Sequence, residues 1–214
     1  MTAFRCSFDG KQSVKRLIEA LGVPHTEVDL VLVNGRSADF GHTLEDGDSV
    51  SVYPVFEAFD IAPLSRVRPR PLRVTRFVAD AQLGRLAAYL RMLGFDTLYR
   101  NDFQDDELAA LSASERRILL TRDRDLLKRR AVTHGHFIRE ISPRLQLAEV
   151  VERFDLAGSV KPFTRCMKCN RVLESAGRFS RCGDCGNLYW EGSHYRRMEK
   201  FIEQVVRRVD HGVN

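Results

Sequence analysis

The chain has 214 residues, of which 43% are hydrophobic and 29% are charged, and its net charge is +5. This composition excludes an intrinsically disordered chain, because it provides enough apolar side chains to bury a core. No stretch approaches the ~18 uncharged apolar residues of a membrane span, and the first residues lack the apolar run of a signal peptide, so we expect a cytoplasmic protein with no membrane partner.

Charge is divided unevenly along the chain. Residues 1–60 hold 5 Lys and Arg against 10 Asp and Glu, whereas the remaining residues hold 29 against 19. This asymmetry indicates that a polyanion such as nucleic acid would bind only the second part. The alternative is that these Lys and Arg side chains form an ordinary solvated surface.

Residues 1–57 are predicted to form a β-grasp domain, in which one helix packs on a small mixed sheet. An amphipathic run at residues 13–21, with Ser13 as its N-cap, indicates the helix. Strands are expected at residues 4–8, 28–34 and 48–56. Cys6, in the first of these strands, is expected to be a buried core thiol rather than a nucleophile.

Residues 58–73 contain three prolines among arginines and are predicted to be an extended linker. In residues 74–160, apolar runs alternate with amphipathic runs, which indicates an α/β domain with a parallel sheet covered by helices. The expected strands and helices follow one another at residues 76–80, 83–94, 95–99, 105–115, 117–121, 124–130, 136–140 and 142–154.

Residues 161–192 contain two Cys-x-x-Cys pairs separated by twelve residues, Cys166 with Cys169 and Cys182 with Cys185. Four thiolates complete a closed tetrahedral site, so we expect a zinc ribbon with a structural Zn²⁺. A redox pair or an iron–sulfur cluster is the less favoured alternative. Residues 193–214 are predicted to form a helix whose apolar stripe packs on the domain at residues 74–160.

Aspartates follow the strands of the expected parallel sheet. Asp80 ends the first strand, Asp123 and Asp125 follow the third, and Asp105 begins a helix. Because parallel strands end at the same edge of a sheet, these carboxylates are expected to converge, and carboxylate oxygens suit Mg²⁺ or Mn²⁺.

An alternative explanation exists for each of these aspartates. Asp105 and its neighbour Asp106 are also what the first turn of a helix favours. Asp123 and Asp125 can equally be ion-pair partners of the adjacent Arg122 and Arg124. The spacing of the aspartates alone does not decide between these explanations and a metal site.

Several separated motifs carry a resemblance to a known family. They are, in chain order, FVADAQLGRLAAYLRMLGFDT, DDELAALSASERRILLTRDRDLL, RCMKCN, RCGDCGNLYW and EGSHYRRM. In these runs the chain resembles the Mut-seven C-terminal RNase family, a PIN-like fold with a zinc ribbon. The resemblance implies an α/β architecture with a ubiquitin-like front domain, a PIN-like domain, a ribbon and a final helix.

The front segment SVKRLIEALGVPHTEVDLVLVNG, followed by LEDGDSVSVYP, resembles ubiquitin-like domains related to the sulfur carriers of molybdopterin and thiamine synthesis. A sulfur carrier ends in a free Gly-Gly, whereas this strand continues into more protein at residues 55–58. Thiocarboxylate chemistry is therefore not expected, and the front domain is expected to bind a protein partner.

The resemblance implies a metal-dependent ribonuclease that hydrolyses phosphodiester bonds of single-stranded or structured RNA. The matching acidic positions, Asp80, Asp105, Asp123 and Asp125, would hold Mg²⁺ or Mn²⁺, with Asp106 competing for the place of Asp105. Basic residues expected near this edge to contact RNA are Arg85, Arg122, Arg124, Lys128, Arg129 and Arg130. The alternative is a non-cleaving RNA-binding or ribosome-associated adaptor.

Overall fold

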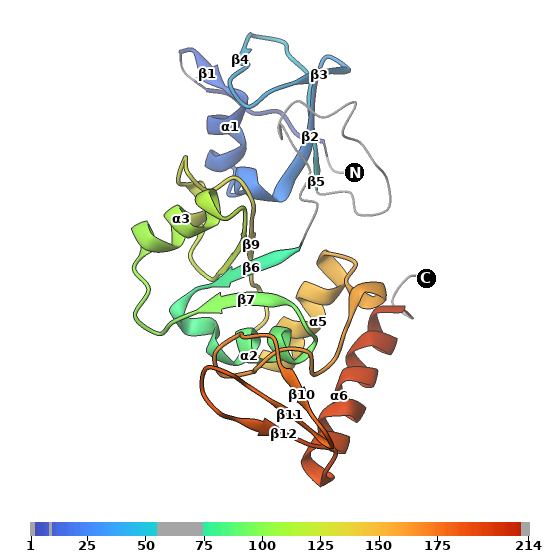
Figure 1. The fold of residues 1–214 in the computed structure, drawn as a ribbon. Helices are drawn as coiled ribbons and strands as arrows, with labels where there is room; N and C mark the ends of the chain where they lie inside the picture. The colour runs from blue at the N-terminus through green and yellow to red at the C-terminus, as the bar shows by residue number, and fades with distance from the viewer. Residues whose placement is uncertain (1–2, 9, 55–74, 211–214) are drawn as a thin grey trace. The chain divides into compact units, whose positions relative to one another are not determined.

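The computed structural model describes residues 3–8, 10–54 and 75–210. The chain divides into two compact units, Met1–Pro71 and Leu72–Asn214, and each is described by itself (Figure 1). The predicted linker at residues 58–73 lies outside the described residues. No helix in the described part of the chain combines the length and the hydropathy that crossing a membrane requires.

In the front unit, one helix packs on short antiparallel strands. The elements are β1 (Gln12–Ser13), α1 (Val14–Ala20), β2 (Val28–Val33), β3 (Arg36–Ala38), β4 (Thr43–Leu44) and β5 (Val50–Pro54), with a 3-10 turn at His25–Glu27. Strands β3, β2 and β5 form one sheet in this order, and β1 pairs with β4. Val14 and Ile18 of α1 are buried with Val31 of β2 in the core of this unit.

Local sequence signals set the helix start and the first hairpin of this unit. The Ser13 hydroxyl accepts a hydrogen bond from the Arg16 N–H at 3.3 Å, so Ser13 caps α1 as predicted. Asn34 and Gly35 connect β2 to β3 with φ angles of 51° and 76°. A two-residue hairpin turn of this kind requires left-handed backbone at both positions, which Asn and Gly tolerate best.

The N-terminal segment contradicts two predictions. Residues 4–8 form no strand, and Cys6 is exposed instead of buried. The alternating pattern of this run is not accompanied by burial, since Phe4 is 66% exposed. Gln12 and Ser13 make the pairing with β4 instead, so none of the described strands pairs with residues 4–8.

The second unit is built around a parallel sheet of four strands, which confirms the predicted fold class. Its strands are β6 (Arg76–Ala79), β7 (Asp96–Tyr99), β8 (Ile118–Thr121) and β9 (Gly135–Phe137), in the order β7-β6-β8-β9. Its helices are α2 (Gly84–Met92), α3 (Asp105–Ser114), α4 (Arg124–Lys128) and α5 (Pro143–Arg153), with 3-10 turns at Ala81–Leu83 and Ala157–Ser159. Because all four strands are parallel, their carboxyl ends lie at one edge.

Helices cover both faces of this sheet (Figure 1). Side chains that follow one another along a strand point to opposite faces. Phe77 is accordingly buried among residues of α2 and α5, whereas its neighbour Val78 is buried among residues of α3 and α4.

Gly94 lies just after α2 and ends this helical segment, with a φ of 96°. A Cβ added there would lie 2.3 Å from the Lys161 carbonyl oxygen, so the position requires glycine.

The C-terminal part of this unit consists of a small sheet and a long helix. The antiparallel strands β10 (Glu174–Ala176), β11 (Phe179–Arg181) and β12 (Leu188–Tyr189) are followed by α6 (Ser193–Asp210). Ile202 and Val205 of α6 are buried in the core that contains Phe77. The Phe201 ring also lies 5.1 Å from that of Tyr89 in α2, so α6 packs beside the helices of the parallel sheet.

Candidate functional site

The four cysteines of the predicted zinc site come together in the structure. Their sulfur atoms all lie within 4.8 Å of one another, with 3.5 Å between Cys166 and Cys185 and 3.2 Å between Cys169 and Cys182. Tetrahedral Zn–S bonds of about 2.3 Å place sulfur atoms about 3.8 Å apart, so the cluster has a suitable size. It can bind a metal such as zinc, and four thiolates would leave no ligand position open for a substrate.

Tight turns and one tyrosine hold the cysteines in place. The Cys166 carbonyl accepts a hydrogen bond from the Asn170 N–H at 2.9 Å, and the Cys182 carbonyl accepts one from the Gly186 N–H at 3.0 Å. The Tyr189 hydroxyl of β12 accepts from a backbone N–H of the first turn at 3.0 Å and lies 3.2 Å from the Cys166 sulfur. Tyr189 therefore ties the second half of the ribbon to the first.

The surroundings of Cys166 and Cys169 shift the pKa values of the two thiols in opposite directions. Burial raises the pKa of Cys166, but hydrogen bonds from the Tyr189 hydroxyl and from the backbone of Cys169 and Lys168 outweigh it and lower the pKa to about 6. Burial and the neighbouring thiols raise the pKa of Cys169 to about 12. A cation that binds the four sulfur atoms as thiolates would release the protons that they still carry.

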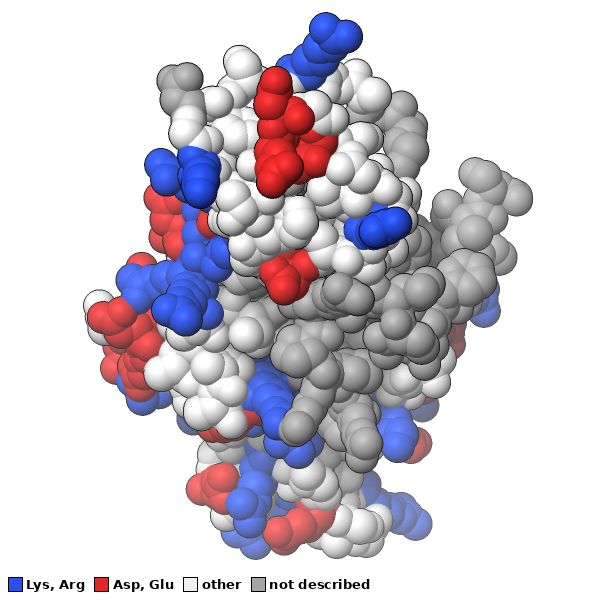
Figure 2. Space-filling view, turned by 90° about the horizontal axis from the view of Figure 1, so that it is seen from above, with Lys and Arg blue, Asp and Glu red and all other residues white. Residues whose placement is uncertain are grey.

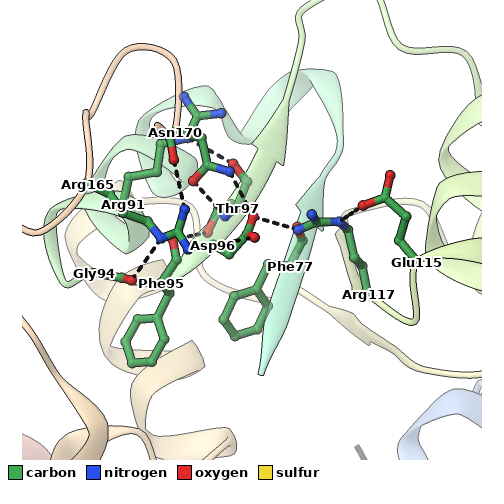
Figure 3. Close-up of polar contacts among 10 residues, drawn as sticks. All are labelled: Phe77, Arg91, Gly94, Phe95, Asp96, Thr97, Glu115, Arg117, Arg165 and Asn170. Carbon is green, nitrogen blue, oxygen red and sulfur yellow. Dashed lines mark hydrogen bonds and ion pairs between the residues drawn. The ribbon is translucent and has the colours of Figure 1, made fainter. Parts of the chain in front are cut away.

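A buried polar network attaches the ribbon to β7 (Figure 3). The Asn170 side chain accepts a hydrogen bond from the Thr97 N–H at 3.0 Å and donates one to Asp96 at 2.8 Å. Arg117 donates to the same Asp96 oxygen at 2.7 Å. Burial raises the pKa of Asp96, but these bonds from Arg117 and Asn170 outweigh it, so the pKa lies below its usual 3.8.

Arg91 of α2 makes a second attachment, directly behind the first cysteine pair. It is 4% exposed, and it donates to the carbonyls of Met167 and Lys168 at 3.2 and 2.8 Å and to that of Thr97 at 2.9 Å. Burial lowers the pKa of Arg91, while the nearby Cys166 raises it. A buried guanidinium at this position compensates the negative charge of thiolates.

At the carboxyl edge of the parallel sheet, one threonine joins two of the predicted aspartates. The buried Thr121 hydroxyl donates to Oδ2 of Asp80 at 2.6 Å and accepts from the Asp123 N–H at 2.9 Å. Oδ1 of Asp123 caps α4 by accepting from the N–H groups of Asp125 and Leu126. Within the described residues, no hydrogen bond or ion pair reaches the second oxygen of Asp80 or of Asp123.

Basic side chains engage the remaining aspartates. The Lys128 ammonium lies 2.9 Å from an oxygen of Asp125 and lowers the pKa of that carboxyl. Arg129 pairs with both Asp105, at 3.4 Å, and Asp106. Among all described residues, the cysteine cluster is the only group of three or more His, Cys, Asp or Glu that is arranged to hold a metal ion. Thr121 therefore links Asp80 to Asp123, whereas the other carboxylates form ion pairs with Lys128 or Arg129.

The basic residues expected to contact RNA differ in their partners. Arg122 donates to the Glu140 carbonyl at 2.6 Å, and the Arg124 guanidinium lies 4.8 Å from the centre of the Phe137 ring. Within the part of the chain that the structure describes, four of the six have no ion-pair partner. These four are Arg85, Arg122, Arg124 and Arg130.

Three residues of these sites were not identified from the sequence. Thr121 stands two residues before Asp123 and is the one polar residue of the buried strand β8. Asn170 follows Cys169 directly and has a φ of 69°, a conformation that Asn adopts more readily than most residues. Arg91 interrupts the apolar face of a helix. For Thr121 and Arg91 the signal is a polar residue among apolar positions of a strand or helix, whereas no such pattern surrounds Asn170.

Comparison with known families decides the assignment of the chain. The Mut7-C RNAse domain model matches residues 75–178 and 171–202. The chain belongs to the Mut7-C RNAse domain family. The Mut7-C ubiquitin model matches residues 1–60 in front of it, so the family resemblance and the ubiquitin-like nature of the front domain are both confirmed. Comparisons with curated proteins and with solved structures gave no match.

Proposed function

We propose that this Mut7-C protein hydrolyses RNA phosphodiester bonds with the help of a divalent cation, and that Asp80 and Asp123 hold this cation. The observation that carries the proposal is the Thr121 hydroxyl, which joins both aspartates at the edge where the parallel strands end. Membership of an RNase domain family supports RNA as the substrate.

The donor set fits Mg²⁺ or Mn²⁺. These cations prefer oxygen ligands, and Mg²⁺ usually takes one or two carboxylates from the protein and keeps several waters. Asp80 and Asp123 each offer one carboxylate oxygen that has no partner among the described residues. The cysteine cluster offers soft sulfur ligands instead, and we assign it to a structural zinc ion.

The residues around this pair have distinct roles in the proposed reaction. A divalent cation, when bound, makes water a better nucleophile and reduces the negative charge of the scissile phosphate. Thr121 orients the Asp80 carboxylate through its 2.6 Å hydrogen bond, and the start of α4 orients Asp123. Arg122 and Arg124, which flank Asp123, are assigned to the phosphates of the RNA, together with Arg85 and Arg130.

Asp105 and Asp125 join the proposed site only when RNA is present. Their ion pairs with Arg129 and Lys128 lie on the surface, and pairs of this kind contribute only about 0–1 kcal/mol to stability. RNA phosphates can therefore replace the aspartates as ion-pair partners of Arg129 and Lys128, and the two carboxylates are then free to bind the metal ion. Asp106 remains the alternative to Asp105, because Arg129 contacts both.

Cleavage of labelled single-stranded RNA by wild type and Asp80→Asn tests the proposal. Asp80→Asn keeps the size of the side chain and removes its charge, so product formation in Mn²⁺ should fall by at least about 100-fold while the fold is retained. The matched control is Asp155→Asn, the same change at an exposed residue beyond α5. Equal rates for wild type and Asp80→Asn would contradict the proposal.

A non-cleaving RNA-binding adaptor is the second candidate. One observation favours it: basic side chains already hold Asp105, Asp106 and Asp125, which leaves two carboxylates at the edge. RNA binding by the wild type without any metal-dependent product, over several RNAs, would establish this alternative.

We also propose that the front domain acts by binding a protein partner. Figure 2 shows acidic side chains in several separate groups on the face that is drawn. Within the turn between β4 and β5, Glu45 and Asp46 are exposed. An acidic surface repels RNA and is complementary to a basic partner protein.

A further inference from the structure

The small sheet of the ribbon presents apolar side chains to solvent. Of nine large hydrophobic residues that are exposed in the described part of the chain, four lie within residues 172–190. An apolar group of this kind on one small sheet marks a binding surface, whereas single exposed apolar residues do not. We call the surface formed by residues of β11, of β12 and of the position directly after β12 the outer face: Phe179, Arg181, Leu188 and Trp190.

Strand register places these side chains together. Arg181 of β11 pairs with Leu188 of β12. Continuing this register by two residues on each strand, past the pair Ser180 and Tyr189, sets Phe179 beside Trp190, and the alternation of side chains puts all four on one face. Phe179 and Trp190 are 47% and 58% exposed. Tyr189 points to the opposite side, where its hydroxyl reaches the cysteine cluster, so the outer face is not needed to build the metal site.

Positive charge surrounds the outer face. Residues 161–192 hold six Lys and Arg against three Asp and Glu. Arg178 and Arg181 form no ion pair within the described residues, and the first two turns of α6 add the exposed Arg196, Arg197 and Lys200. Aromatic rings interleaved with arginines are complementary to the bases and phosphates of single-stranded nucleic acid.

We propose that the outer face binds single-stranded RNA, with bases stacked on Phe179 and Trp190 and phosphates contacted by Arg178 and Arg181. This inference rests on the proposed function, and it adds a binding subsite separate from Asp80 and Asp123. A second copy of this chain is the less favourable occupant, because symmetric contact would bring two positive surfaces together. Double-stranded RNA is also less favourable, since its bases are already stacked on one another.

The attachment of the ribbon gives this subsite a defined position. Asn170 and Arg91 bind the ribbon to β7 and α2 through hydrogen bonds that are buried or partly buried. Both elements belong to the same compact unit as β6, the strand directly before Asp80. The outer face therefore has a fixed position relative to Asp80, but the ribbon is attached where β7 begins, so an RNA strand that occupies both sites has to extend from there to the carboxyl edge.

Trp190 is the only tryptophan of the chain, so intrinsic fluorescence reports directly on the outer face. The zinc-loaded full chain is titrated with a short labelled single-stranded RNA, without added Mg²⁺ or Mn²⁺, and tryptophan fluorescence is followed beside the anisotropy of the label. We expect quenching that saturates together with the anisotropy, and much less quenching by a duplex of the same sequence. Phe179→Ala should weaken binding by about fivefold or more. Phe4→Ala, which removes an exposed aromatic from the front unit, is the matched control and should leave the Kd unchanged.

The outcomes separate this inference from the proposed function. If RNA binds but tryptophan fluorescence stays constant and Phe179→Ala binds like wild type, the outer face is not the subsite, although the chain still binds RNA. If the wild type binds no RNA, the proposed function fails as well. Concentration-dependent dimerisation that Phe179→Ala abolishes would assign the face to a second copy and overturn the inference. Zinc content is measured for every variant, and Phe179→Leu, which keeps an apolar side chain without a ring, replaces Phe179→Ala if zinc is lost.

Discussion

Asn170 connects the cysteine cluster to the parallel sheet, and its replacement by alanine is the most direct test of that connection. The Asn170 side chain accepts from the Thr97 N–H and donates to Asp96, and its backbone has a φ of 69°. Thr97 is fully buried, so water cannot replace the lost partner of its N–H group. We expect Asn170→Ala to destabilise the second unit strongly.

The size of this effect can be built up from the contacts. Leaving the Thr97 N–H buried without an acceptor costs about 1–3 kcal/mol. Losing the bond to Asp96, which keeps Arg117 as a partner, costs about 1 kcal/mol more. Alanine in the left-handed region adds about 1 kcal/mol, so the free energy of unfolding should fall by about 3–5 kcal/mol. Asn170→Gly loses the same hydrogen bonds without the backbone strain, and it should be about 1 kcal/mol less destabilising.

Urea unfolding of the zinc-loaded chain by circular dichroism measures the free energy, and hydrogen exchange of the Thr97 amide locates the change. Asn101→Ala, the same substitution in an exposed turn after β7, is the control and should leave both readouts unchanged. Refutation would be an unfolding free energy of Asn170→Ala within about 1 kcal/mol of wild type, together with a Thr97 amide that is still protected. In that case the network would be present without stabilising the attachment.

Two further predictions concern the metal and pH. A thiol reagent should modify only Cys6 in the zinc-loaded chain and all five cysteines after chelation, and reaction of all five before chelation would exclude a closed site. Burial raises the pKa of Glu149, but hydrogen bonds from His136 and from the N–H groups of Arg139 and Glu140 lower it below 4.5. Its carboxylate therefore stabilises the fold above pH 4.5, and this contribution is lost as the pH falls through the folded pKa. The difference in the free energy of unfolding between wild type and Glu149→Gln should therefore shrink as the pH falls through this acidic range. If urea titrations give the same difference throughout this pH range, the charge of Glu149 is not the cause of the stabilisation.

Much of the fold can be predicted from the sequence because its signals are local. Ser142 and Pro143 mark the start of α5, and Gly94 marks the end of the α2 segment, each through a backbone preference of the residue itself. Pairing partners are not local information. Residues 4–8 alternate like a strand, but Gln12 and Ser13 occupy the pairing position on β4, and no pattern within five residues reveals that.

The two candidate sites also differ in how far local sequence predicts them. The spacing of Cys166, Cys169, Cys182 and Cys185 identifies a metal cluster, because two tight turns are enough to bring four sulfur atoms together. The aspartate edge depends instead on tertiary contacts. Arg129 reaches Asp105 across 24 residues of sequence, and the Thr121 hydroxyl selects Asp80 across 41. The sequence predicts that these aspartates lie at one edge, but it does not show which of them form ion pairs with basic side chains.

Strand β7 connects the cysteine cluster to the carboxyl edge within four residues. At its start, the Thr97 N–H is bound by Asn170 of the ribbon, and at its end the Tyr99 hydroxyl donates to the Ala81 carbonyl at 3.0 Å, next to Asp80. β7 pairs with β6 along its whole length, so a displacement at one end is carried to the main chain at the other. The Tyr99 ring has little room to adapt, since an added Cβ on Gly84 would lie 2.6 Å from its oxygen. A structural zinc ion that holds the ribbon in place would therefore also fix one side of the proposed RNA-cleaving site, and its removal should impair turnover without any change to the aspartates themselves.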